Sequence, residues 1–209
     1  MNPTRLERIA PLTGVAFLVL LVIGTVLINN YEFLPPGDEI KAFYEDNSTS
    51  IRIGAWVVFL GAAALTWFAG SLRVALRKAE GGSGRLSAVS FGGGIAAAAT
   101  MLVGMGATLT AAARGGSDAG IGVETATGLF DLSAVLIGSV APIALAVMLG
   151  AAAVVSFRSG AFASWFTWVT AVVAIGLLLP ELSWIFTAPA ALWVALAGYL
   201  IYRSEGAAA

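Results

Sequence analysis

The chain has 209 residues, of which 59% are hydrophobic and 11% are charged, whereas soluble domains carry about 25% charged residues. It contains no Cys and no His, which excludes disulfides, Cys/His zinc sites and haem held by either residue. The net charge of −1 gives no indication of a partner. Apolar runs of about twenty residues recur, and each could span a bilayer as a helix. We therefore predict an all-α polytopic membrane protein, a bundle of six transmembrane helices in one domain, without a cofactor.

The first predicted span covers residues 9–28. Arg5 and Arg8 precede it, and Pro11 lies in its first turn, where a missing N–H costs little. A signal peptide would end in a small-x-small cleavage pattern, but Asn29-Asn30-Tyr31-Glu32 follows instead. We therefore expect this helix to be retained in the mature protein.

A polar loop follows and contains one short predicted helix, residues 38–46, which Asp38 could cap. Ile40, Phe43 and Tyr44 share one face of this helix because they are spaced at i, i+3 and i+4. An amphipathic helix of this kind lies on the membrane surface or packs over the mouth of the bundle. The alternative is a lid or a segment that docks a partner.

The remaining spans are predicted at residues 51–76, 86–113, 125–156, 162–179 and 184–202. The glycines of Gly81-Gly82-Ser83-Gly84 end the helical pattern between the second and third spans. The start of the last span has two solutions. Either Trp184 begins it and Pro189 kinks it, or Thr187 caps it and Pro189 stands in its first turn.

Basic residues are distributed unevenly over the loops. With the amino end inside, eight of the eleven Lys and Arg residues fall on the inner side. Short loops with such a bias face the cytoplasm. We therefore predict a multi-pass protein of a bacterial plasma membrane with both termini in the cytoplasm. The inner residues are Arg5, Arg8, Arg73, Arg77, Lys78, Arg85, Arg158 and Arg203, and the outer ones are Lys41, Arg52 and Arg114.

The third predicted span carries a small residue at every fourth position. Such a ladder lets two helix backbones approach closely in lipid. We expect it to pack inside the bundle, and the alternative is a face for a homo-oligomer. The six positions are Gly92, Ala96, Thr100, Gly104, Thr108 and Ala112.

Asp131 is the sharpest chemical feature, because it lies within the predicted span 125–156. A carboxylate inside a membrane is costly unless it is paired or hydrated, so such acids are candidates for function. Arg52 and Arg114 lie at the outer level and are possible partners. We favour an ion pair that clamps the bundle, and the alternative is an acid that handles a ligand or a proton. On the same helix, Pro142 predicts a kink, because it leaves the carbonyl of Gly138 without its helical donor.

Two other acids of the outer side, Glu124 and Glu181, are further candidates. Together with Asp131 they could support acid–base chemistry or bind a cation, if the helices bring them together. The other interpretation is a solvated acidic rim, which we favour because the acids lie on different segments.

Three stretches resemble a family of small six-helix actinobacterial integral membrane proteins that has no assigned activity. They are PPGDEIKAFYEDNSTSIRIG, GLFDLSAVLIG and RSGAFASWFTW. In the last of these, Ala163-Ser164-Trp165 replaces the Pro-Arg-Trp of the family pattern. The resemblance implies the six-helix fold and the bacterial membrane, and it implies no mechanism.

No catalytic signature and no nucleotide loop is present in the sequence, and no basic stripe suggests nucleic acid. The leading hypothesis is a non-enzymatic protein with a structural or interaction role, whose partner is the lipid bilayer. The first alternative is a small transporter or channel in which Asp131 couples an ion or a proton. The second is a membrane enzyme that acts on lipid at the outer face, using Asp131 with Glu124 or Glu181.

Overall fold

A computed structural model describes residues 8–28 and 36–207, with side chains up to Ser204. Arg5, Glu32 and Pro35 of the sequence prediction lie outside the described residues. The described chain is helical and without strands, which confirms the all-α prediction. The elements are η1 (Ala10–Leu12), α2 (Thr13–Ile28), α3 (Gly37–Asp46), α4 (Ser48–Glu80), α5 (Arg85–Gly115), α6 (Val123–Val135), the π-helical turn η2 (Leu136–Val140), α7 (Ala141–Ser159), α8 (Ser164–Leu178) and α9 (Ser183–Ala207).

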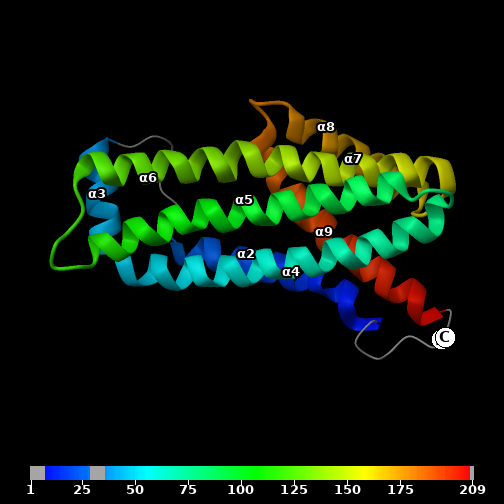
Figure 1. The fold of residues 1–209 in the computed structure, drawn as a ribbon, viewed down its shortest axis with the longest axis horizontal. Coiled ribbons are helices and arrows are strands. Elements are labelled where there is room, and N and C mark those ends of the chain that lie inside the picture. The colour runs from blue at the N-terminus through cyan, green and yellow to red at the C-terminus, as the bar shows by residue number, and fades with distance from the viewer. Residues whose placement is uncertain (1–7, 29–35, 208–209) are drawn as a thin grey trace.

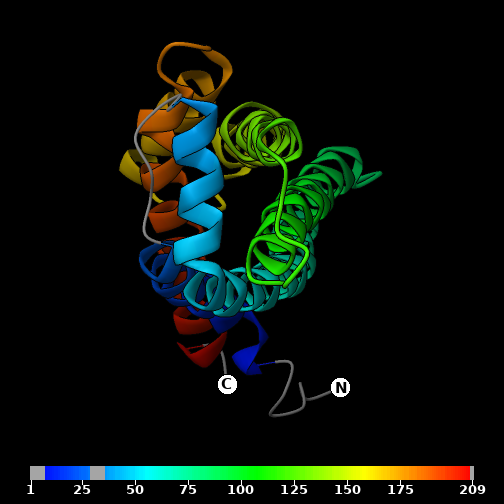
Figure 2. The ribbon, with the colours of Figure 1, turned by 90° about the vertical axis from the view of Figure 1, so that its left-hand side faces the viewer.

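The long helices run side by side along the long axis of the molecule, and α3 lies across one end (Figure 1). Seen from that end, α3 crosses in front of one side of the bundle (Figure 2). The turn between α8 and α9 reaches only to about the middle of the long axis (Figure 1). The half of the bundle near α3 is therefore built without α8 and α9.

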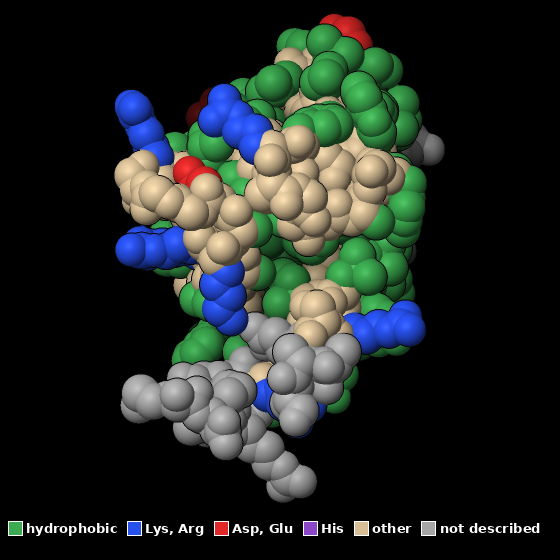
Figure 3. Space-filling view, turned by 90° about the vertical axis from the view of Figure 1, so that its right-hand side faces the viewer, with side chains coloured by type: hydrophobic (Ala, Val, Ile, Leu, Met, Phe, Trp, Pro, Cys, Tyr) green, Lys and Arg blue, Asp and Glu red, His purple; other side chains and the backbone are tan. Residues whose placement is uncertain are grey.

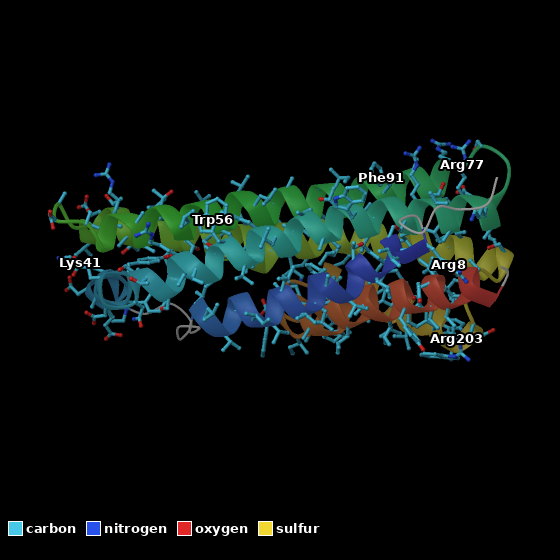
Figure 4. All side chains as sticks on the ribbon, turned by 90° about the horizontal axis from the view of Figure 1, so that it is seen from below. Arg8, Lys41, Trp56, Arg77, Phe91 and Arg203 are labelled. Atoms are coloured by element: carbon cyan, nitrogen blue, oxygen red, sulfur yellow. The ribbon has the colours of Figure 1, made fainter. Side chains whose placement is uncertain are left out.

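Opposite ends of the bundle differ in charge. Arg8, Arg77 and Arg203 gather at one end, and Lys41 lies at the other (Figure 4). Lys and Arg side chains project from several points around the first of these ends (Figure 3). We refer to it as the basic end and to the end that carries α3 as the α3 end. The two described ends of the chain, near Arg8 and Arg203, both lie at the basic end (Figure 4).

Small residues on α5 allow close packing, but only part of the predicted ladder lies on the packed face. A Cβ added to Gly93 would lie 2.6 Å from the backbone nitrogen of Met148, so α5 and α7 touch backbone to backbone here. Of the ladder, Gly104, Thr108 and Ala112 are buried, whereas Gly92 and Ala96 are exposed. The reason is geometric, since a step of four residues turns a helix by about 40° beyond a full turn, and the row winds around the helix.

Apolar side chains form two separate cores. The larger core fills the bundle from the basic end to the middle and contains the buried aromatic residues Phe68, Phe166 and Trp193. The smaller core lies beneath α3, where Ile40, Phe43 and Tyr44 pack against α4, α5 and α6. The predicted apolar face of the short helix is therefore buried over the mouth of the bundle. The helix begins at Gly37, one residue before the predicted cap Asp38.

Within the part of the chain that the structure describes, five helices are long and apolar enough to cross a membrane, judged by length and composition: Ala10–Ile28, Ser48–Glu80, Arg85–Gly115, Val123–Ser159 and Ser183–Ser204. The predicted span 162–179 is a shorter helix of 15 residues. It begins late because Gly160 adopts a left-handed backbone with φ 67°, and residues 161–163 are not helical. It ends early because Leu179 is extended.

Pro142 and Pro189, which lie inside later predicted spans, behave differently. A π-helical turn, η2, ends two residues before Pro142, so the helix 123–159 adjusts its winding close to where the proline removes a donor. The last helix begins at Ser183 and contains Pro189 in its interior. The first of the two solutions for this helix, with its start near Trp184, is therefore the one adopted.

Candidate functional site

The structure places all five predicted site residues on the surface. Asp131, Glu124, Arg52, Arg114 and Glu181 are each exposed. Within the described residues, no ion pair joins Asp131 to Arg52 or to Arg114. The interpretation of Asp131 as a paired clamp inside the bundle therefore does not match the structure. The two arginines lie on α4 and α5, close to the α3 end.

The depth of Asp131 explains why the carboxylate can be exposed. Asp131 precedes Arg158 by 27 residues, which corresponds to roughly 40 Å along the helix. The hydrocarbon core of a bilayer is about 30 Å thick. A core that begins at Arg158 ends near Gly138, so Asp131 lies roughly 10 Å beyond it. The carboxylate can then face water or lipid headgroups without a protein partner.

Acidic residues of the predicted rim remain apart. Glu124 is seven residues before Asp131 on the same helix, roughly 10 Å along its axis. Glu181 lies in the turn between α8 and α9. The Ser183 hydroxyl at the start of α9, directly after that turn, donates to the Gly138 carbonyl, which places the turn near the level of Gly138, farther from the α3 end than Asp131. The three acids therefore do not form one acid–base or cation site.

A partly open cavity of about 190 Å³ lies between the two apolar cores. Met105 and Ile137 line it from the side of the larger core, and Phe43 and Phe130 line it from the side of α3. Ala134 also lines the cavity and is itself exposed. The cavity therefore opens beside Ala134, one helical turn from Asp131. Its lining also includes Ile28, Tyr44, Thr108 and Ser133.

We refer to this cavity, which lies toward the α3 end, as the outer cavity. Three hydroxyl groups form its polar part. The Thr108 and Ser133 hydroxyls are hydrogen-bonded at 2.8 Å across α5 and α6, and both residues are buried. The Tyr44 phenol from α3 is also buried, and the Thr108 side chain is its hydrogen-bonding neighbour. Burial raises the pKa of Tyr44 to about 12, and the Thr108 hydroxyl opposes this rise. The phenol therefore remains a neutral donor at physiological pH.

Sequence reasoning placed Tyr44 and Thr108 correctly but gave them only packing roles. Tyr44 belonged to the apolar face of the short helix, and Thr108 belonged to the small-residue ladder. Ser133 was missed, although it stands two residues after Asp131. Residues at i and i+2 point to nearly opposite sides of a helix, so an exposed Asp131 implies a buried Ser133. The three hydroxyls are far apart in the sequence, and only the packing of α3, α5 and α6 brings them together. No sequence pattern therefore indicates that they converge.

No family model, curated protein or solved structure matches the chain. The described residues contain no group of three or more Asp and Glu side chains that could hold a metal ion. The outer cavity is therefore the candidate site, and its chemistry is read from its lining alone. It combines apolar walls with three neutral hydroxyls.

Proposed function

We propose that the chain is a multi-pass protein of a bacterial plasma membrane with both termini on the cytoplasmic side. The gathering of Arg8, Arg77 and Arg203 at one end supports this orientation, because basic loops face the cytoplasm. The α3 end, with the outer cavity, then faces the exterior. Membership in the actinobacterial family is part of the same proposal.

We include α8 as the sixth span. The helix itself covers roughly 22 Å, and residues 161–163 and 179–182 extend it at both ends. Trp165 and Trp168 are exposed near its start, and Trp184 is exposed just after its end. Tryptophans favour the two membrane–water interfaces. Their separation along α8 therefore supports a crossing of the same hydrocarbon layer that ends near Gly138.

Topology can be measured directly because the chain has no natural cysteine. Ser117→Cys lies in the turn at the α3 end, and Ser83→Cys lies in the turn at the basic end, and both positions are exposed. In intact cells, a membrane-impermeant maleimide should label Ser117→Cys at once and Ser83→Cys only after the cells are permeabilised. Labelling in the reverse order would overturn the orientation.

For activity, we propose a non-enzymatic binding role at the outer cavity for a neutral amphipathic molecule. The observation that carries this proposal is the lining, which pairs apolar walls with the hydroxyls of Tyr44, Thr108 and Ser133. Ligand sites typically combine apolar walls with a few placed polar groups. Met105, which lines the cavity, lies roughly 30 Å along α5 from Arg85. A hydrocarbon layer that begins at the level of Arg85 therefore ends at the level of this cavity. A lipid could therefore enter from the side, beside Ala134.

Neither alternative receives the same support. Transport coupled to an ion needs a charged group that faces an interior path, and the exposed Asp131 is not part of the cavity lining. An enzyme that uses Asp131 with Glu124 or Glu181 needs two carboxyl groups close to one reacting bond. These acids lie at different levels of the bundle, as described above.

Native mass spectrometry of the purified protein with added diacylglycerol tests the binding role. The wild-type protein should retain diacylglycerol, Ala134→Phe should lose it by filling the mouth, and Tyr44→Phe should weaken it by removing a donor. Ala113→Phe is the control, because Ala113 is exposed near the same end and does not line the cavity. Equal retention by the wild-type protein and Ala134→Phe would exclude the cavity as the site.

A homo-oligomer through the small-residue ladder remains a proposal. Its contact face is limited to the exposed ladder positions Gly92 and Ala96 on α5. Among the described residues, no atom outside the adjoining turns of α5 lies within 4 Å of a Cβ added at Gly92. The surface there is open to a second copy of the chain.

A further inference from the structure

The three hydroxyls of the outer cavity form an open chain with Thr108 in the middle. The Thr108 hydroxyl lies 2.8 Å from the Ser133 hydroxyl, and it is also the hydrogen-bonding neighbour of the Tyr44 phenol. Within the described residues, Tyr44 and Ser133 share no hydrogen bond with each other, and none of the three hydroxyls bonds to a backbone carbonyl. The chain is therefore limited to two links.

This open chain has one donor more than it can use. Each hydroxyl carries one O–H, so three donors serve two links, and one O–H is left over whichever way the links run. Tyr44, Thr108 and Ser133 are all buried, and a buried donor without an acceptor costs free energy. An unused lone pair on an oxygen is tolerated more readily. The cavity therefore favours a ligand that brings a hydrogen-bond acceptor.

The polarity of the cavity changes along the bundle axis. Met105 and Ile137 form its apolar side, and the hydrocarbon layer described above ends at about their level. Thr108 follows Met105 by three residues and Ser133 precedes Ile137 by four, which places both hydroxyls roughly 5–6 Å beyond that level. In a glycerolipid, the carboxylic esters join the acyl chains to the glycerol and so lie where the hydrocarbon ends. The hydroxyls are therefore at the level of the ester groups.

The cavity is too small for a whole lipid. Its volume of about 190 Å³ is below the roughly 300–1,000 Å³ of pockets that enclose a drug-sized ligand. It opens beside Ala134, which is exposed. The group at the top of one acyl chain can therefore enter the cavity while the rest of the lipid stays in the bilayer.

We propose that the outer cavity recognises the carboxylic ester of an acyl lipid in the outer leaflet. The ester carbonyl accepts the hydroxyl proton that the chain of three leaves unused. The first methylenes of the acyl chain lie along Met105 and Ile137, and the alcohol end of the lipid stays outside, beside Ala134. This inference rests on the proposed binding role of the outer cavity and adds to it the chemical group that is bound.

The test compares an ester with an ether. The full-length protein, purified in a neutral detergent, is titrated with dioleoylglycerol and separately with its ether analogue dioleylglycerol, and the bound lipid is measured by native mass spectrometry. The two lipids share the free hydroxyl and the chain length and differ in the ester carbonyl. The wild-type protein should bind the ester roughly five-fold more tightly, because one hydrogen bond distinguishes the two complexes. Equal binding would overturn ester recognition, and this comparison needs no variant.

The double variant Tyr44→Phe/Ser133→Ala removes the donors at both ends of the chain. The remaining Thr108 hydroxyl can donate to a carbonyl of its own helix one turn back, as the Thr110 hydroxyl does to Gly106. This variant should bind both lipids as weakly as the wild-type protein binds the ether. Thr110→Val is the matched control, because it removes an exposed hydroxyl of α5 outside the cavity, and it should keep the preference. An ester preference that survives in the double variant would overturn the role of the hydroxyls, as would its loss in Thr110→Val.

Ala134→Phe separates a failure of this inference from a failure of the proposed binding role. By filling the mouth, it should reduce the binding of both lipids. If it does so while the wild-type protein binds the two lipids equally, the cavity binds lipid without recognising the ester, and this inference alone is overturned. If Ala134→Phe binds both lipids as the wild-type protein does, the cavity is not the site and both proposals are overturned.

Discussion

The Ser183 hydroxyl lies 3.3 Å from the carbonyl oxygen of Gly138, 45 residues away in sequence, and shares its one proton between this oxygen and the carbonyl oxygen of Pro180 at 3.2 Å. Gly138 is the residue whose helical donor would be the N–H of residue 142, and Pro142 has none. The start of α9 therefore supplies the hydrogen bond that the proline removes. The contact joins the short α8–α9 hairpin to the middle of the 123–159 helix.

Ser183→Ala should destabilise the protein by about 1 kcal/mol, because the Gly138 carbonyl then loses the donor that replaces the missing N–H of Pro142. In a Pro142→Ala background the same change should cost less, since residue 142 regains an N–H for that carbonyl. The measurement is a double-mutant cycle by reversible unfolding in mixed micelles. Ser139→Ala, at an exposed position of the same π-helical turn, is the control and should be neutral. Additive losses would show that the two sites do not share the carbonyl.

The two adjacent glycines Gly92 and Gly93 should respond oppositely to the same substitution. Gly93→Ala places a Cβ 2.6 Å from the Met148 nitrogen and 2.8 Å from the Ala144 carbonyl oxygen, so we expect a loss of about 1–3 kcal/mol from overpacking. Gly92→Ala meets open space and should be neutral, or stabilising by up to about 1 kcal/mol. Thermal unfolding in detergent measures both.

Cross-linking of Gly92→Leu tests the homo-oligomer in parallel. If the exposed face of α5 joins two copies, Gly92→Leu should reduce the cross-linked dimer while the thermal stability of the monomer is kept. Unchanged cross-linking in Gly92→Leu would contradict the proposed interface at that face.

Composition and periodicity were sufficient to predict the helical architecture, because apolar runs and glycine breaks are local signals. The α8 boundaries were less predictable, since residues 161–163 are apolar yet follow the left-handed turn at Gly160. The small-residue ladder was predicted from a spacing of four, but the face that packs is decided by the neighbouring α7. A second core beneath α3 was only partly foreseen, in the apolar face of Ile40, Phe43 and Tyr44.

The candidate site was harder to predict than the fold. Charge drew attention to Asp131, whose side chain lies on an exposed face of its helix. The cavity depends on three neutral hydroxyls from three helices, Tyr44, Thr108 and Ser133. Neutral hydroxyls carry no charge signal, and their distances depend on tertiary packing. A single sequence therefore indicates where the acids are but not which polar groups converge.

The Tyr44 phenol should ionise at a pH well above the ordinary value for tyrosine. Its pKa is raised from 10.0 to about 12 by burial, so the tyrosinate absorbance that is lost in Tyr44→Phe should have its midpoint at about pH 12. The sign for stability follows from linkage: the contribution is fully present below pH 10, and it is lost as the pH rises to about 12, because the unfolded phenol ionises first. A midpoint near pH 10 would mean that water reaches the phenol.

Asp131→Asn should leave the stability within about 0.5 kcal/mol of the wild type, because Asp131 is exposed and joined to neither arginine. Breaking a buried ion pair would instead cost about 3–5 kcal/mol. Unfolding of Asp131→Asn, Arg52→Gln, Arg114→Gln and the two double variants therefore distinguishes an exposed acid from a clamp. Near-zero coupling between Asp131 and each arginine is expected. A large loss shared with one arginine, and absent with the other, would restore the clamp and identify its partner.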